Sequence, residues 1–205
     1  DQRRLLGELA LSYSNHGLLL TELGVEVRAE KALRDAIRIQ RRLVQLEPDN
    51  PLFTRQLASG LNNLTAGLVE QQPARAIDYY REALDLLEPL RDRRAQDREL
   101  SAEAAVTWNN LGSALSRLRK YRDATDAHGR AIEIVQQLER AAPGRKSSSH
   151  SLALSLNNRG VARRNVREFV EAENDLRWAL ELYDELTDRF PSEVALYCEL
   201  SPSVP

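Results

Sequence analysis

Apolar residues recur along the chain at the spacing of an amphipathic helix. In one stretch they stand three or four positions apart, at Ile77, Tyr80, Leu84, Leu87 and Leu90. Residues at this spacing share one face of a helix. The apolar residues of the chain are mostly leucine and alanine, which favour helices over strands. We therefore expect an all-α fold.

The pattern itself repeats every 47 or 48 residues. One series of asparagines and two series of alanines follow this period: Asn15, Asn63, Asn110 and Asn158; Ala29, Ala76, Ala124 and Ala172; Ala36, Ala83, Ala131 and Ala179. A fixed period of this length indicates an array of similar structural units, here helical hairpins. The one residue missing from the second copy lies near Gln71, Gln72 and Pro73, where a turn is predicted.

The whole of residues 1–205 reads as one repeat domain, with units at about 3–48, 51–95, 97–143 and 149–191. In the first unit, helices near 3–23 and 28–46 are separated by Gly24, a suitable C-cap. Asn50 can cap the next helix, with Pro51 at its first position.

Three features predict irregularities. Pro89 lies within the apolar pattern of the helix that starts near Pro73, so we expect a kink or an early stop there. The polar linker at 143–149 is expected to be exposed and mobile before a fourth hairpin at about 150–187. Ser192 can begin a short C-terminal helix at 192–200, which would cap the array.

Composition narrows the function classes. The chain is 42% hydrophobic and 29% charged, with a net charge of -2, which is ordinary for a soluble protein. No apolar run approaches the ~20 residues that cross a bilayer. Because the chain begins at Asp1 and contains no Met, we expect it to be part of a longer protein. Cys198 is its only cysteine, which excludes an internal disulfide and fits a cytoplasmic location.

The third unit carries a familiar arrangement of packing residues: Trp108, Leu111, Gly112, Leu115, Ala124, His128 and Ala131. In this spacing the chain resembles a tetratricopeptide repeat (TPR) protein. The resemblance implies a right-handed α-solenoid. Departures from the pattern are Thr65 in place of the glycine, and His16 and Arg159 in place of the leucine.

The unit is longer than the usual ~34 residues. It looks like the long TPR units of the kinesin-light-chain type and of large bacterial multidomain proteins. In the latter, such arrays often follow a serine/threonine kinase domain, although no kinase motif is present here. We therefore expect a signalling or scaffolding module of a larger bacterial protein.

In TPR proteins the first helix of each hairpin lines a concave groove, which commonly binds an extended or helical peptide. By this resemblance the candidate groove residues are Asn15, Asn62, Asn63, Asn109, Asn110, Asn157, Asn158, Ser113, Arg117 and Arg164. A side-chain amide can both donate to and accept from a peptide backbone. The alternative is that one asparagine of each pair bonds an adjacent helix and holds the repeats together.

Charge on the predicted groove wall changes sign along the array. Glu22 and Glu70 stand at the position that Arg117 and Asn165 occupy in the later units, and Arg164 adjoins Asn165. The C-terminal half is therefore expected to prefer acidic groups. The alternative is a solvated face on which these charges contribute little.

The sequence offers no constellation for catalysis, cofactors or metals. His16, His128 and His150 fall at unrelated positions, and no phosphate-binding loop or nucleophile motif is present. Basic residues are interleaved with acidic ones, which does not favour nucleic-acid binding. We expect a non-enzymatic protein–protein interaction module with a protein or peptide partner. The alternative is a structural spacer or self-association scaffold, which would expose an apolar patch away from the groove.

Overall fold

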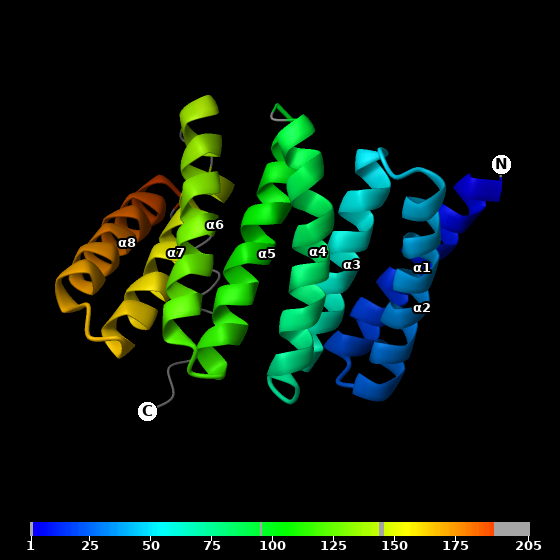
Figure 1. Ribbon diagram of the computed structural model, residues 1–205, viewed down its shortest axis with the longest axis horizontal. Helices are drawn as coiled ribbons and strands as arrows, with labels where there is room; N and C mark the ends of the chain where they lie inside the picture. Colours follow the sequence, from blue (N-terminus) through cyan, green and yellow to red (C-terminus); the bar gives the residue numbers. More distant parts are fainter. Residues whose placement is uncertain (1, 95, 144–145, 191–205) are drawn as a thin grey trace.

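Eight α-helices form the described part of the chain. The computed structural model describes residues 2–94, 96–143 and 146–190, and these residues contain no strand. The helices are α1 (Gln2–Glu22), α2 (Glu26–Leu46), α3 (Pro51–Leu68), α4 (Pro73–Arg93), α5 (Arg98–Arg117), α6 (Tyr121–Ala141), α7 (Lys146–Asn165) and α8 (Phe169–Arg189). They follow one another as four antiparallel pairs in a row (Figure 1). The all-α solenoid expected from the sequence is confirmed, and the expected helix at 192–200 lies outside the described residues.

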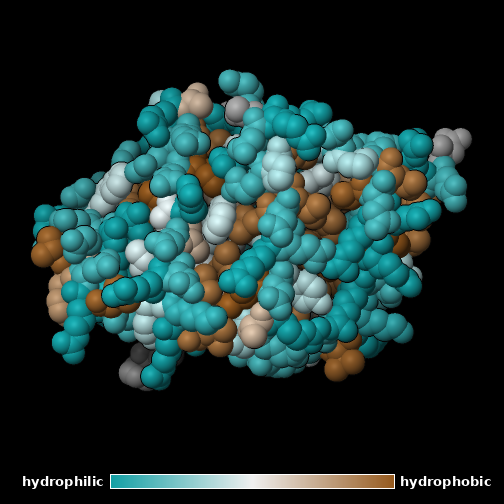
Figure 2. All heavy atoms as spheres, viewed as in Figure 1, coloured by the Kyte–Doolittle hydropathy of each residue, from teal (hydrophilic) through white to brown (hydrophobic). Residues whose placement is uncertain are grey.

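The row of hairpins has an inner and an outer layer. First helices approach one another (α1 with α3, α3 with α5, α5 with α7), whereas the backbones of second helices do not approach one another within the described residues. Such an arrangement curves the array, with the first helices on the concave side. The outer layer of second helices faces the viewer in Figure 1, and Figure 2 shows this face as mostly hydrophilic, with hydrophobic atoms in the seams between helices.

Small residues sit where helices cross. The second alanine series, Ala36, Ala83, Ala131 and Ala179, is buried, as is the first series. At Gly112, an added Cβ would lie 2.6 Å from the imidazole ring of His128 on α6. The periodic alanines and Gly112 therefore allow the helices to pack closely.

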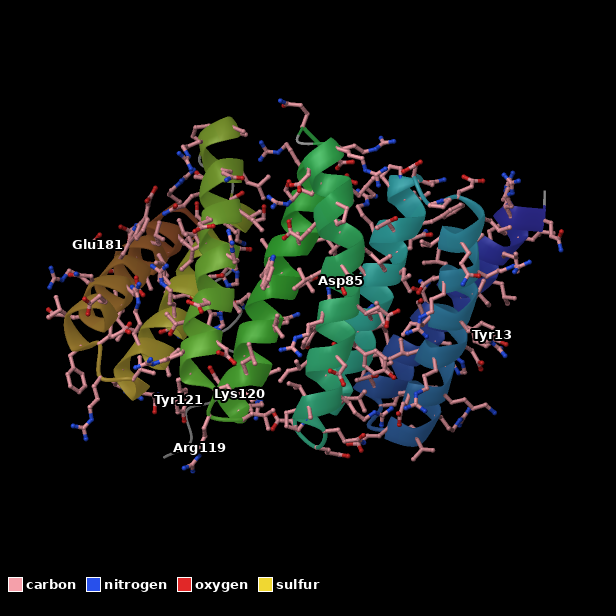
Figure 3. All side chains as sticks on the ribbon, in the orientation of Figure 1. Tyr13, Asp85, Arg119, Lys120, Tyr121 and Glu181 are labelled. Atoms are coloured by element: carbon pink, nitrogen blue, oxygen red, sulfur yellow. The ribbon has the colours of Figure 1, made fainter. Side chains whose placement is uncertain are left out.

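Three of the four hairpin turns end their first helix in the same way. Gly24 has a φ of 70°, and the N–H of Val25 donates to the carbonyl of Leu20 at 2.9 Å, a Schellman-type cap. Arg119 and Arg167 take the same left-handed conformation, with φ of 58° and 67°. Arg119 lies at the turn into Tyr121, where α6 begins (Figure 3). The cap expected at Gly24 is thus present, and two of its equivalents are made by arginine.

Asn50 caps α3 as predicted. Its side chain accepts a hydrogen bond from the N–H of Leu52 at 3.1 Å, and Pro51 occupies the first helical turn. Thr65, at the position expected for glycine, is fully buried. Its hydroxyl donates along its own helix to the carbonyl oxygens of Leu61 and Asn62, so no polar atom of the hydroxyl is left unpaired.

Two local expectations need correction. The helix α4 does not stop early at Pro89 but continues to Arg93, and the alternative of a kink at Pro89 stays a prediction. Pro89 is exposed, and because it has no N–H one backbone hydrogen bond of the helix is not made there. The linker expected at 143–149 is also wrong, because α7 already begins at Lys146. Ser148 is buried at the position that Leu100 occupies one unit earlier, so tertiary packing overrides the weak helix preference of serine.

No helix among the described residues has the length and apolar character that crossing a membrane requires.

Candidate peptide groove and the contacts behind it

The paired asparagines divide into a buried and a more accessible series. The first members Ser14, Asn62 and Asn109 are each only 8% exposed. The second members are accessible: Asn15 is exposed, and Asn63, Asn110 and Asn158 are half-buried. Consecutive residues on a helix point about 100° apart, so only one member of a pair can face the neighbouring unit. Asn157, the first member in α7, is half-buried and departs from the series.

Asn62 joins the second and third units. Its side-chain N–H groups donate to Glu103 Oε1 at 2.8 Å and to Thr107 Oγ1 at 2.9 Å, both on α5. Burial raises the pKa of Glu103, and the hydrogen bond from Asn62 opposes this shift. Asn62 therefore bonds an adjacent helix and joins two repeats, which is the alternative to groove binding given above.

Asn109 has a similar position between the third and fourth units. Its side-chain oxygen lies 2.9 Å from Nδ1 of His128 and 3.3 Å from the side-chain nitrogen of Asn158 on α7. Since this oxygen only accepts, Nδ1 of His128 carries the proton. Burial, followed by the charge of Arg159, lowers the pKa of His128 to about 4. His128 is therefore a neutral packing and hydrogen-bonding residue rather than a free base.

Arg159, unexpected at a leucine position, belongs to a buried ion cluster in the fourth hairpin. It donates to both carboxylate oxygens of Asp175, at 2.8 and 2.7 Å, and Arg163 donates to the same carboxylate at 2.7 Å. Asp175 is buried, and both guanidinium groups are largely so. The corresponding residues of the third unit are Leu111, Ala127 and Leu115. An Arg–Asp–Arg cluster thus replaces an apolar contact.

Two of the charges that change sign along the predicted groove wall form an ion pair between neighbouring repeats. Arg117 forms an ion pair with Glu70, the residue at the equivalent position of the preceding unit. Arg164 is exposed on α7, and Ser113 donates its hydroxyl hydrogen bond to the backbone carbonyl of Asn109 at 3.1 Å. Of the two cationic candidates, Arg164 is thus the one that is exposed and forms no ion pair within the described residues.

A hollow of about 220 Å³ opens between α1 and α3 on the first-helix side. Its polar lining consists of Ser14, Asn15, Gln40, Gln56, Ser59 and Asn63. Sequence reasoning did not identify Gln40, which projects into the hollow from α2. The repeat could have identified it, because the equivalent positions one and two units later hold the apolar residues Leu87 and Val135. A glutamine at this position interrupts an apolar series.

The described residues contain no group of three or more His, Cys, Asp or Glu side chains that could hold a metal ion. The histidines lie apart: His128 is buried, His16 is exposed, and the ring of His150 meets that of Tyr183 edge-on at 6.2 Å between centroids.

Comparisons with known proteins agree with this architecture. Residues 105–139 match the family model described as tetratricopeptide repeat. The structure is similar to BtubC (BKLC) from P. vanneervenii, with 22% identity, a TM-score of 0.71, and coverage of 87% of this chain and 65% of that one. It is also similar to the apo form of RapI, with 17% identity, a TM-score of 0.64, and coverage of 87% and 44%.

A third match is a putative kinesin light chain with TPR-like repeats from Podosopora anserina, at 16% identity and a TM-score of 0.45, covering 97% of this chain and 99% of that one. The chain spans less than two thirds of the length of the first two proteins. A comparison with curated proteins finds no match. The resemblance stated from the sequence is confirmed by the family model for one repeat and by the solved structures for the fold.

Proposed function

Because the chain is built of tetratricopeptide repeats, we propose that it is a protein–protein interaction module that binds a segment of its partner in the concave groove. The observation that carries the proposal is the accessible asparagine series. Asn63, Asn110 and Asn158 stand one repeat apart on successive first helices and are partly accessible, with Asn158 also donating one hydrogen bond to Asn109. An extended chain laid along these helices could meet each amide in turn, since every amide both donates and accepts.

The buried series supplies the contrast that makes the proposal testable. Asn62 is committed to α5 and should contribute to stability, whereas the side chain of Asn110 makes no hydrogen bond to the described part of the chain. Replacing Asn110 by Ala should weaken peptide binding about tenfold, because peptide groups at the centre of the array would lose their partners. The melting temperature should change little.

The experiment selects peptides against the unmodified chain from a display library. It then measures their affinity and the melting temperature for Asn110→Ala and Asn62→Ala. We expect Asn110→Ala to lower the peptide affinity without changing the melting temperature. We expect Asn62→Ala to lower the melting temperature. If Asn110→Ala lowers the melting temperature by several degrees while affinity holds, the groove assignment of the accessible series is withdrawn.

The setting is part of the proposal. We expect a non-catalytic, cytoplasmic segment of a larger bacterial signalling protein, in which the array recruits a partner for a neighbouring domain such as a kinase. The support is the length of the repeat unit. The sequence of the complete gene tests this setting directly.

A second candidate, end-to-end self-association, is favoured by the surface of α1. Leu5 and Leu9 are 64% and 46% exposed, whereas their equivalents two units later, Leu100 and Ala104, are completely buried by the preceding hairpin. At the other end, Leu180 on α8 is 63% exposed where Ile132 is buried one unit earlier. Within the described residues, the first and last hairpins thus expose residues with which repeats stack on one another.

The occupant that fits α1 is the α7–α8 end of a second copy. On α5, Thr107 donates to the backbone carbonyl of Glu103, and the side chains of these two residues accept hydrogen bonds from Asn62. On α1, Ser12 donates in the same way to the carbonyl of Glu8, at 2.9 Å. Asn157 on α7 stands at the position of Asn62 and could donate across such a junction. The junction between two copies would therefore repeat an interface that already joins units inside the array, which supports end-to-end association.

Sedimentation over a range of concentrations tests the second candidate. The unmodified chain should show a mass that rises with concentration, and Leu5→Glu with Leu9→Glu should abolish the rise. Leu52→Glu, a similar change at an exposed leucine of α3, should leave it intact. A monomer at all concentrations refutes the stacking role.

A further inference from the structure

The hollow between α1 and α3 contains two buried polar atoms without a partner. Ser14 is 8% exposed and Gln40 is 5% exposed, and neither Oγ of Ser14 nor Oε1 of Gln40 has a hydrogen-bond partner among the described residues. Buried polar groups in native proteins are paired in the large majority of cases. Two unpaired atoms lining one hollow therefore point to a group that enters it.

The hollow is built by a coordinated pair of residues. Gln40 projects toward Gly60 on α3, and a Cβ at position 60 would collide with the Gln40 carboxamide. At the next junction the same two positions hold Leu87 and Thr107. The first junction thus has, in place of a leucine, a buried amide whose Oε1 is unpaired, which lowers stability in the absence of a ligand.

The lining defines the chemistry of the occupant. None of its ten residues is charged, so an ammonium or guanidinium group would enter without a counter-charge, and a carboxylate would face the carbonyl of Gln40. We propose that the hollow is a subsite for a primary carboxamide, the side chain of an Asn or Gln in the bound partner segment. This proposal rests on the proposed function of the groove.

A primary carboxamide can satisfy every polar group that the hollow presents. Its N–H donates to Oε1 of Gln40, and its carbonyl accepts from the hydroxyl of Ser14 or from the side-chain amides of Asn15 and Asn63 at the rim. The exposed leucines Leu11 and Leu18 flank the opening and can contact the aliphatic stem.

The first experiment needs no peptide. The full chain, isotope-labelled, is titrated with propanamide, and the side-chain amide signals of Gln40, Asn15 and Asn63 are followed by NMR. Propanoate and butanone are controls that keep the size but lack the N–H donor, and both should bind about tenfold more weakly. Equal responses to the three compounds, or no response at Gln40, overturn the subsite.

Gln40→Leu is the decisive variant, because it installs the residue found one unit later. It should remove the propanamide response and raise the melting temperature. Gln45→Leu makes the same chemical change at an exposed position of the same helix and should alter neither. If Gln40→Leu keeps the response, the hollow is not its origin and the proposal falls.

The second experiment uses display-selected peptides and separates this proposal from the proposed function. Selection should enrich Asn or Gln at one position, and replacing that residue by Leu should cost about tenfold in affinity with the unmodified chain but little with Gln40→Leu. If selected peptides lack this preference yet depend on Asn110, the groove function stands and the subsite falls. If propanamide binds but no peptide is selected, the subsite stands and the groove function falls.

Discussion

A single buried imidazole gives the array a dependence on pH. His128 has a pKa of about 4 in the folded chain, lowered first by burial and then by Arg159, against about 6.5 when exposed. Below pH 6.5 the unfolded chain therefore binds a proton that the folded chain does not. The free energy of unfolding should fall by up to ~3 kcal/mol as the pH drops from 6.5 to 4.

His128→Leu is the matched control for this prediction. Leu33 and Leu176 occupy the equivalent positions and pack against Gly17 and Gly160, so the replacement has two precedents in the same fold. Denaturant unfolding at several pH values should show a shallower pH dependence for the variant. An unchanged slope would mean that other groups carry the effect.

The turn at Arg119 offers a gain in stability from one substitution. Its φ of 58° places a side chain in the left-handed region, whereas the equivalent Gly24 bears no Cβ. Arg119→Gly should stabilise the chain by ~0.5–1 kcal/mol, and Gly24→Ala should destabilise it by a similar amount. Chemical denaturation measures both, and a loss of stability for Arg119→Gly would contradict the argument.

At the scale of the helix, the periodic alanines limit how far side chains can grow. Ala131 on α6 is completely buried. Ala131→Leu should cost ~1–3 kcal/mol through overpacking. Ala102→Leu, at an exposed position of α5, should be nearly neutral. Equal melting temperatures for the two variants would show that Ala131 is not at a tight crossing.

The fourth hairpin depends on an ion cluster for its inner contact. Asp175→Ala leaves Arg159 and Arg163 buried without their carboxylate, so the expected loss is ~3–5 kcal/mol. The triple change Arg159→Leu, Arg163→Leu and Asp175→Ala recreates the third unit and should be neutral or stabilising. Thermal unfolding distinguishes the two outcomes, and a triple variant less stable than Asp175→Ala would refute the comparison.

Over the whole molecule, the period of the sequence was sufficient to predict the fold. The recurring alanines and Gly112 report where helices must approach closely, and this requirement is the same in every unit. The turn at Gly24 and the cap at Asn50 were also predictable, because glycine and asparagine act there through local backbone geometry.

The contacts between units were not predictable in the same way. Which asparagine of a pair is buried depends on how far successive hairpins rotate, a quantity set by side-chain packing rather than by the period. Gln40 and the Arg159–Asp175 pair could be noticed only as departures from the repeat, and their partners lie on other helices. The helical conformation of Ser148 in α7 was not predictable either, because its burial against the preceding unit outweighs the weak helix preference of serine.

The ion cluster of the fourth hairpin also bears on how the array responds to cold. Unfolding of a unit held by Leu111, Leu115 and Ala127 hydrates apolar surface and so raises the heat capacity, whereas exposing Arg159, Arg163 and Asp175 adds polar surface, which lowers it. The stability curve of the fourth hairpin should therefore be flatter with temperature than that of the third. On cooling, the apolar units lose part of their driving force first, and the C-terminal hairpin is the part of the described array least weakened by low temperature.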